Sequence, residues 1–226
     1  MTHGKRYKAL VKEVPQDLIS IEEALKFIKD KSDEKFDPTV ELHVRLGVDP
    51  KQSDQQVRGS VALPAGTGKD VRVVAVVDDA KVKEAESAGA DRTGGEDIVK
   101  EIKAGKMDFD VLVATPDMMP KLGSVAKVLG PRGLMPNPKT ETVGPDVGKL
   151  IAAIKAGKAN FKTDDYGIIH MPVGKKSFDL EKLQKNIEAA LDAIKAAKPK
   201  GIKGQYIKNV RLASSMGPGL KVKVTG

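Results

Sequence analysis

Two kinds of strand pattern occur in this 226-residue chain, and they occupy different parts of it. Residues 40–46 (VELHVRL) alternate strictly between apolar and polar side chains, which is typical of a strand with one buried and one solvated face. Residues 71–77 (VRVVAVV) and 111–114 (VLVA) are instead nearly continuous apolar runs, as expected of strands buried on both faces. The chain therefore predicts two folding regions of different design.

Four helical segments accompany the buried strands in the middle of the chain. Apolar spacing and local start and stop signals place them at residues 80–88, 96–103, 115–128 and 145–154. Strands that alternate with helices in this way are typical of a mostly parallel sheet between helix layers. We therefore predict an inserted α/β, Rossmann-like three-layer domain over residues 67–157.

The two ends of the chain carry a different set of elements. Ser20 and Glu23 have the spacing of a capping box, which predicts the start of a helix. Residues 179–197 repeat apolar side chains on one helical face. A strand is predicted at 40–46, and a second at 57–63 is expected to pair with it. Further strands are predicted at 160–162, 167–173, 205–214 and 220–224.

These elements predict an α+β outer domain made of residues 1–66 plus 158–226. Its sheet is expected to be antiparallel, with helices on one face. The middle domain is then inserted between the two outer segments. The glycine-containing crossings at 64–68 and 156–157 are expected to form a hinge.

The net charge of +8 lies entirely in the two ends. Residues 67–157 hold 14 basic and 14 acidic residues, so the remainder of the chain carries the whole excess. A basic excess confined to part of a chain is the electrostatic footprint of a module that binds polyanions. After residue 192 the chain contains no acidic residue. The basic residues in this segment are Lys195, Lys198, Lys200, Lys203, Lys208, Arg211, Lys221 and Lys223.

Composition excludes several classes of protein. The chain has no Cys, which rules out disulfides and thiolate metal sites and fits a reducing cytosol. His3, His43 and His170 lack metal-ligand spacing, and no apolar run approaches the length of a membrane span. The polar, basic start does not resemble a signal peptide. We expect a cytoplasmic protein with no metal, no cofactor and no contact with membranes. Aromatic residues are scarce, so a nucleic acid bound here is expected to be a folded shape rather than a loose strand.

The segment Gly66-Thr-Gly68-Lys69 has some features of a phosphate-binding loop. Such a loop needs a further glycine at the position of Leu63 and Ser or Thr at the position of Asp70, and a helix must follow. A strand is predicted there instead. We therefore favour a hinge over a nucleotide site.

Two other functional classes remain open at this point. The α/β pattern allows a small-molecule-binding enzyme with a basic accessory domain, whose site would lie at the strand ends near Asp78, Asp79 and Asp117. No glycine fingerprint or nucleophile motif supports catalysis, and acids after strands commonly cap helices. A general DNA-binding protein is the other alternative, and it would bind duplex DNA and structured RNA with similar affinity.

Two segments have unusual composition. Residues 129–139 (LGPRGLMPNPK) contain three prolines and two glycines, which exclude a helix and a central strand. They form either a rigid surface loop that presents Arg132 and Lys139 or a simple connector. Residues 214–219 (SSMGPG) combine hydroxyls, a Met and close-approach glycines, which suit the sugar edges of an RNA groove, but a plain hairpin turn fits equally well.

Five motifs resemble those of the bacterial large-subunit ribosomal protein L-one family, and the resemblance covers essentially the whole chain. It implies a two-domain, hinged, non-catalytic protein, a monomer when free, that is part of the large ribosomal subunit. It also implies binding to the side-stalk region of large-subunit rRNA, assistance to exit-site tRNA release, and repression of translation of its own operon mRNA. One departure is Ser215, where the family commonly has Thr. The motifs are 35–41 (KFDPTVE), 54–59 (DQQVRG), 114–117 (ATPD), 129–139 and 215–218 (SMGP).

The resemblance also implies the site residues. The hydroxyls of Thr39, Ser214 and Ser215 would form hydrogen bonds with ribose or phosphate. Glu41 would accept hydrogen bonds from 2′-OH or base amino groups, and Met216 with Gly217 would allow close packing. The main RNA surface is expected to comprise Lys35, Phe36, Thr39, Glu41, His170, Ser214, Ser215, Met216 and Gly217. Arg211, Lys221 and Lys223 would attract phosphates. Arg132 and Lys139 are candidates for a second RNA or tRNA contact.

Overall fold

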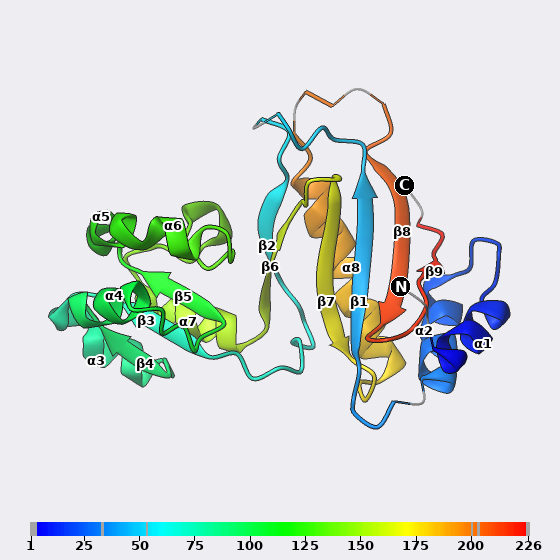
Figure 1. The fold of residues 1–226 in the computed structure, drawn as a ribbon, viewed down its shortest axis with the longest axis horizontal. Coiled ribbons are helices and arrows are strands. Elements are labelled where there is room, and N and C mark those ends of the chain that lie inside the picture. The colour runs from blue at the N-terminus through cyan, green and yellow to red at the C-terminus, as the bar shows by residue number, and fades with distance from the viewer. Residues whose placement is uncertain (1–3, 33, 53, 200, 203, 225–226) are drawn as a thin grey trace. The chain divides into compact units, whose positions relative to one another are not determined.

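The computed structural model describes residues 4–32, 34–52, 54–199, 201–202 and 204–224. The chain divides into two compact units (Figure 1). The outer unit comprises Met1–Gly68 and Ala159–Gly226, and the inserted unit comprises Lys69–Lys158. Each has its own hydrophobic core, and together they give a mixed α/β protein with a four-stranded antiparallel sheet, a three-stranded parallel sheet and a small two-stranded sheet.

A four-stranded antiparallel sheet dominates the outer unit, in the order β7-β1-β8-β9. Its strands are β7 (Ile168–Lys175), β1 (Thr39–Leu46), β8 (Ile207–Ser214) and β9 (Leu220–Lys221). The alternation predicted for β1 is confirmed, because Val40, Leu42, Val44 and Leu46 are all buried. Those side chains share one core with α2 and α8, so these helices cover one face of the sheet.

The helices of the outer unit are α1 (Lys5–Glu13), α2 (Ile21–Lys31) and α8 (Leu180–Ala196). The capping box predicted for α2 is present. The Ser20 hydroxyl accepts from the Glu23 amide at 3.2 Å, and the Glu23 carboxylate accepts from the Ser20 amide at 2.9 Å. Asp179 occupies the N-cap of α8 as predicted, without a side-chain hydrogen bond to the helix.

The pairing predicted for residues 57–63 is wrong. They form β2 (Arg58–Ala62), which pairs with β6 (Lys158–Lys162) in a separate two-stranded sheet. The reason is that a strand has two hydrogen-bonding edges, and β7 and β8 occupy both edges of β1. Both partners of β1 come from far along the chain, and strand pattern alone does not reveal such pairings.

In the inserted unit, the parallel sheet runs in the order β4-β3-β5 and is buried between two helix layers. Side chains of β3 alternate between two cores, which confirms a strand buried on both faces. The strands are β3 (Val73–Val76), β4 (Arg92–Gly94) and β5 (Val111–Ala114). One layer holds α3 (Asp79–Ser87) and α7 (Val147–Lys155), and the other holds α4 (Glu96–Lys103), α5 (Met119–Leu122) and α6 (Ala126–Leu129).

The single helix predicted over 115–128 is wrong. The segment is a series of short helical pieces: a 3₁₀ turn at Pro116–Met118 precedes α5, and a second at Gly123–Val125 separates α5 from α6. Pro120 lacks an amide donor and Gly123 disfavours helix, so a regular helix cannot run through. The three-residue strand β4 was not predicted, because Arg-Thr-Gly has no strand pattern. α7 begins at Val147 rather than at residue 145.

The described residues include neither a membrane-spanning helix nor a cluster of metal-binding side chains. None of their helices has the length and apolar character that crossing a membrane requires. No group of three or more His, Asp or Glu side chains among them is arranged to hold a metal ion.

Candidate nucleic-acid interface

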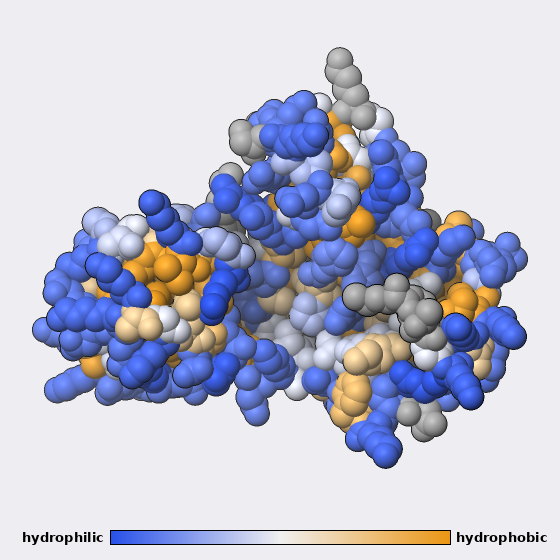
Figure 2. Space-filling view, viewed as in Figure 1, coloured by the Kyte–Doolittle hydropathy of each residue, from blue (hydrophilic) through white to orange (hydrophobic). Residues whose placement is uncertain are grey.

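The face of the outer sheet opposite the helices carries polar side chains. Strand register places Lys221 of β9 beside Arg211 of β8, Arg211 beside His43 of β1, and His43 beside His170 of β7. These four side chains form one row across all four strands, which we call the basic row. In Figure 1 this face is turned to the viewer, and α8 lies behind the strands. Figure 2, seen from the same side, shows hydrophilic side chains over much of it.

Two histidines form one half of the basic row. Their Nδ1 atoms are 2.8 Å apart, so one ring donates and the other accepts. His43 Nε2 lies 3.6 Å from Glu41, and His170 Nε2 lies 3.3 Å from Asp164. Burial lowers the pKa of His43, and His170 lowers it further, against the opposing effect of Glu41. The middle of the row therefore favours a neutral imidazole at His43, and the half formed by Arg211 and Lys221 carries permanent positive charge.

Asp164 anchors the turn that leads into β7. Its Oδ1 accepts from the amides of Tyr166 at 2.9 Å and Ile168 at 2.7 Å. Burial would raise the pKa of Asp164, but these amides and His170 together lower it. The carboxylate therefore stays ionised and orients the imidazole of His170.

The turn that follows β8, Ser214 to Gly217, lies beside the first residue of β1. The Ser215 amide donates to the Thr39 carbonyl at 2.9 Å, and the Thr39 amide donates to the Ser215 hydroxyl at 3.2 Å. Met216 has a φ of 64° and a side chain that is 72% exposed. A left-handed, exposed, apolar residue is unusual and must be held in place by its surroundings.

The first and last residues of this turn pack tightly. Ser214 is only 7% exposed, and its hydroxyl accepts from the Ser32 hydroxyl at 3.1 Å. A Cβ on Gly217 would lie 2.2 Å from the Ser214 Oγ, so a larger residue must displace that hydroxyl. The hydroxyl of Ser214, which was expected to bond RNA, therefore points inward in this structure and holds the turn.

The segment before β1 completes the surface. Phe36 is 54% exposed and Lys35 is exposed. The Thr39 hydroxyl accepts from the ammonium group of Lys175 at 3.0 Å, so it is positioned by a cation. The Thr39 hydroxyl and the Lys175 ammonium group thereby lie beside the Ser214–Gly217 turn, which carries the exposed Met216.

The structure brings most of the expected site residues to one part of the outer unit. Thr39, Ser215, Met216 and Gly217 lie at or beside the turn, and Glu41, His170, Arg211 and Lys221 lie on the open face. Lys35 and Phe36 are exposed in the segment that precedes β1. Lys223 follows β9, and its amide donates to the Ile19 carbonyl at 2.8 Å. Sequence reasoning missed His43 and Lys175 as site residues. The outward position of His43 was visible in the β1 alternation, but the register that joins it to His170 was not.

The remaining expected contacts lie in the inserted unit. Arg132 is exposed and reaches the sulfur of Met107 at 3.7 Å. Lys139 belongs to the 3₁₀ turn Pro138–Thr140, but its side chain lies outside the described residues. The loop is ordered by hydrogen bonds such as that from the Asn137 amide to the Thr142 hydroxyl at 2.8 Å, which favours a rigid surface loop over a loose connector.

The phosphate-loop alternative does not fit the structure. Lys69 donates to Asp110 at 2.7 Å, and the element that follows it is a strand rather than a helix. The Lys69 ammonium and the Arg72 backbone and side chain hold the pKa of Asp110 at about 2, although burial opposes them. Lys69 is thus already paired with a carboxylate, where a phosphate loop would present it to a ligand.

An open cleft does lie at the carboxyl ends of β3 and β4, where an enzyme site was considered. Asp78 and Asp79 line it, together with Glu96 and Lys121, which form an ion pair at 2.9 Å. That contact lowers the pKa of Glu96 and raises that of Lys121. Both groups are therefore held in their ordinary charged forms, so neither of these two has a pKa shifted toward neutrality.

Comparisons with known proteins identify relatives of this chain. A family model described as the Ribosomal protein L1p/L10e family matches residues 25–218. The Large ribosomal subunit protein uL1 of one strain of Thermus thermophilus is 51% identical over 222 residues, which cover 97% of this chain and 97% of that protein. The protein of the same name from a second strain of Thermus thermophilus gives the same values. The matched residues include β1, β7, β8 and the Ser214–Gly217 turn.

Proposed function

The chain belongs to the Ribosomal protein L1p/L10e family, which is a family of ribosomal proteins and not of enzymes, and on that basis we propose that it binds large-subunit rRNA as part of the cytoplasmic ribosome. The uL1 relatives are named as proteins of the large ribosomal subunit, which supports the same assignment here.

One structural observation carries the proposal. The basic row crosses an uncovered sheet face and lies in the same unit as a turn with an exposed Met and a sterically required Gly. Permanent cations in one half of the row attract the phosphate backbone. The turn and the hydroxyl groups beside it supply close contacts that read the shape and the 2′-OH groups of folded RNA.

We assign different tasks to the residues of this surface. Arg211 and Lys221 neutralise phosphates, while Met216 packs against ribose or base edges. Glu41 accepts hydrogen bonds from 2′-OH or base amino groups. Ser214 and Gly217 act indirectly, because they set the conformation of the turn.

The family resemblance carries the finer part of the proposal. We propose that the bound RNA is the side-stalk region, that the protein assists release of exit-site tRNA, and that it represses translation of its own operon mRNA through a similar RNA fold. Arg132 and Lys139 of the inserted unit are the proposed second RNA or tRNA contact. We also propose that the two units are separate domains joined by a hinge, and that the free protein is a monomer.

Crosslinking to total cellular RNA followed by sequencing tests the proposal. We expect captured fragments to concentrate in one region of large-subunit rRNA, with a smaller peak in the mRNA of its own operon. Peptides crosslinked to RNA should map to β1, β7, β8 and the turn. Capture of RNA and duplex DNA without preference would support the general DNA-binding alternative instead.

A further inference from the structure

Arg6 of α1 reaches two partners that are far from it in sequence. Its Nη1 atom lies 2.6 Å from Glu34 Oε1, and its Nη2 atom donates to the main-chain carbonyl of Met216 at 3.2 Å. One planar guanidinium thus connects the N-terminal helix to the turn that carries the proposed RNA contact. A fork with two donating nitrogens is required for this geometry, and Arg supplies it.

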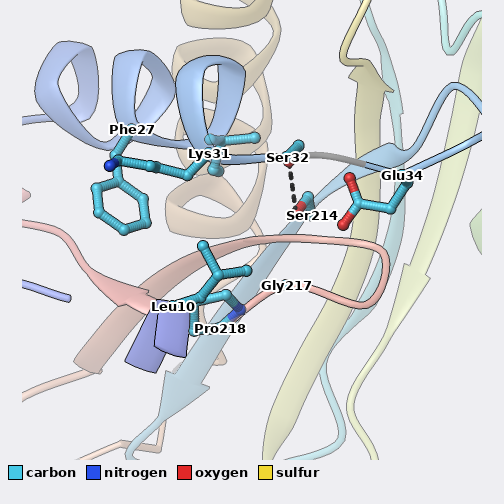
Figure 3. Close-up of a pocket in the computed structure, with 9 residues that line it drawn as sticks. Leu10, Phe27, Lys31, Ser32, Glu34, Ser214, Gly217 and Pro218 are labelled. Atoms are coloured by element: carbon cyan, nitrogen blue, oxygen red, sulfur yellow. Dashed lines mark hydrogen bonds between the residues drawn. The ribbon is translucent and has the colours of Figure 1, made fainter. Parts of the chain in front are cut away.

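Glu34 is unusual for a surface ion pair. Its side chain is only 3% exposed, and its Oε2 atom is buried without a hydrogen-bond partner among the described residues. Figure 3 shows the Glu34 carboxylate pointing toward Ser214, in a small pocket that Leu10, Phe27, Gly217 and Pro218 also line. A buried carboxylate depends strongly on its cation, so Glu34 and Arg6 hold each other in place.

The turn needs such support because its conformation is costly. Met216 is a non-glycine residue in the left-handed region, which strains the backbone unless the surroundings hold it there. The Ser32–Ser214 and Thr39–Ser215 hydrogen bonds hold the residues before Met216. The Arg6 contact is made to the Met216 carbonyl itself.

We propose that Arg6, oriented by Glu34, is a positioning residue for RNA recognition: it holds the main chain of Met216 so that the Met216 side chain projects from the turn. The inference rests on the proposed function and deepens it, because it makes α1 part of the RNA site. Arg6 acts through the turn and does not itself contact phosphate.

Three substitutions in the full-length chain test this inference with purified large-subunit rRNA as the probe. Arg6→Ala removes both contacts, and we expect RNA affinity to fall about tenfold, as for loss of a charge-assisted hydrogen bond. Arg6→Lys keeps the charge but cannot bridge Glu34 and Met216 with two nitrogens, so it should restore only part of the affinity. Lys12→Ala is the matched control, because it removes one positive charge from the exposed surface of α1 at a residue that does not line this pocket, and it should bind like wild type.

Two further readouts separate positioning from a direct contact or a purely structural role. A residue that binds phosphate lowers the slope of log affinity against log salt by about one when it is removed, whereas Arg6→Ala should leave the slope unchanged. Amide exchange in the free protein should quicken at Ser215 and Gly217, whose amides bond within and beside the turn. In a double-mutant cycle, Arg6→Ala should add little to Met216→Ala.

The outcomes decide the inference separately from the proposed function. Wild-type affinity in Arg6→Lys, a lower salt slope in Arg6→Ala, or unchanged exchange at Ser215 and Gly217 would each overturn it. If the wild-type protein fails to bind rRNA, the proposed function is wrong. The exchange measurement, made without RNA, still decides whether Arg6 holds the turn.

Discussion

The sheets of the outer and inserted units differ in how many faces they bury. In the inserted unit, both faces of β3 are covered by apolar helix layers, and all four of its residues are buried. In the outer unit, only one face of the sheet has an apolar core, and the other carries the basic row. An uncovered polar sheet face can hold a ligand directly, whereas a sheet covered on both faces can bind only at its strand ends or through its loops.

The same contrast appears in the charges. Residues 67–157 have equal numbers of acidic and basic groups, and eight ion pairs are formed among the described residues of the inserted unit. In the outer unit, Arg211 and Lys221 form no ion pair with any described residue. Charges paired within a unit add little to attraction of a polyanion, whereas unpaired cations on an open face attract it over a distance set by the salt concentration.

Separating the two units is the most direct test of this contrast. Residues 1–66 joined to 158–226 through a short Gly/Ser linker should bind rRNA within about tenfold of the full-length chain, while residues 67–157 alone should lose more than about a hundredfold. Circular dichroism would establish folding, and fluorescence anisotropy would measure affinity. A folded outer unit that binds more than about a hundredfold more weakly than the intact chain would make the inserted unit a main RNA reader.

Within the outer unit, the turn should contribute more than any single charge. Gly217→Ala places a methyl group against Ser214 and should weaken RNA binding about 30-fold or more while lowering the unfolding temperature by a few degrees. Met216→Ala removes an exposed side chain, so affinity should fall about five- to thirtyfold at an unchanged unfolding temperature. Both effects should appear mainly as faster dissociation. Wild-type affinity in both variants would show that RNA is read elsewhere.

Salt dependence tests the electrostatic difference between the units. With about four neutralised phosphates, affinity should fall about a hundredfold between 50 and 200 mM salt, and the close contacts of the turn should preserve binding near 1 M. Arg211→Gln should reduce the slope by about one, while Lys127→Gln, the same charge change on the inserted unit, should leave it unaltered. Equal effects from the two substitutions would indicate general attraction to the whole surface.

A weaker effect than these is a pH dependence of stability from His43. Folding lowers the pKa of His43 from its ordinary value of 6.5. Near and below that pH the unfolded chain therefore binds more protons than the folded chain, so the free energy of unfolding decreases as the pH falls. The wild-type free energy of unfolding should therefore decline between about pH 7 and 5 more than that of His43→Gln. Asp110, with a pKa of about 2, acts only at much lower pH. The free energies of unfolding can be measured by urea denaturation. An equal decline in the two proteins over this pH range would contradict the effect.

Much of the local structure could be predicted because its causes are local. The Ser20–Glu23 capping box and the β1 alternation depend on residues that are close in sequence. The partner of residues 57–63 could not be predicted, because β1 obtains both its neighbours from more than 100 residues away. The helix predicted over 115–128 is wrong for a different reason: the start signal at Thr115-Pro-Asp outweighed Pro120 and Gly123, which indicate interruption.

Residue order and local propensity were enough to establish the two strand types, the confinement of positive charge to the chain ends and the unusual composition of the 214–219 turn. Which hydroxyls face inward depended on the folded chain, since Ser214 meets Ser32 through packing rather than through proximity in sequence. The contacts of His43 with His170 and of Arg6 with Met216 likewise required the complete fold, because strand register and helix docking follow from burial of the whole core.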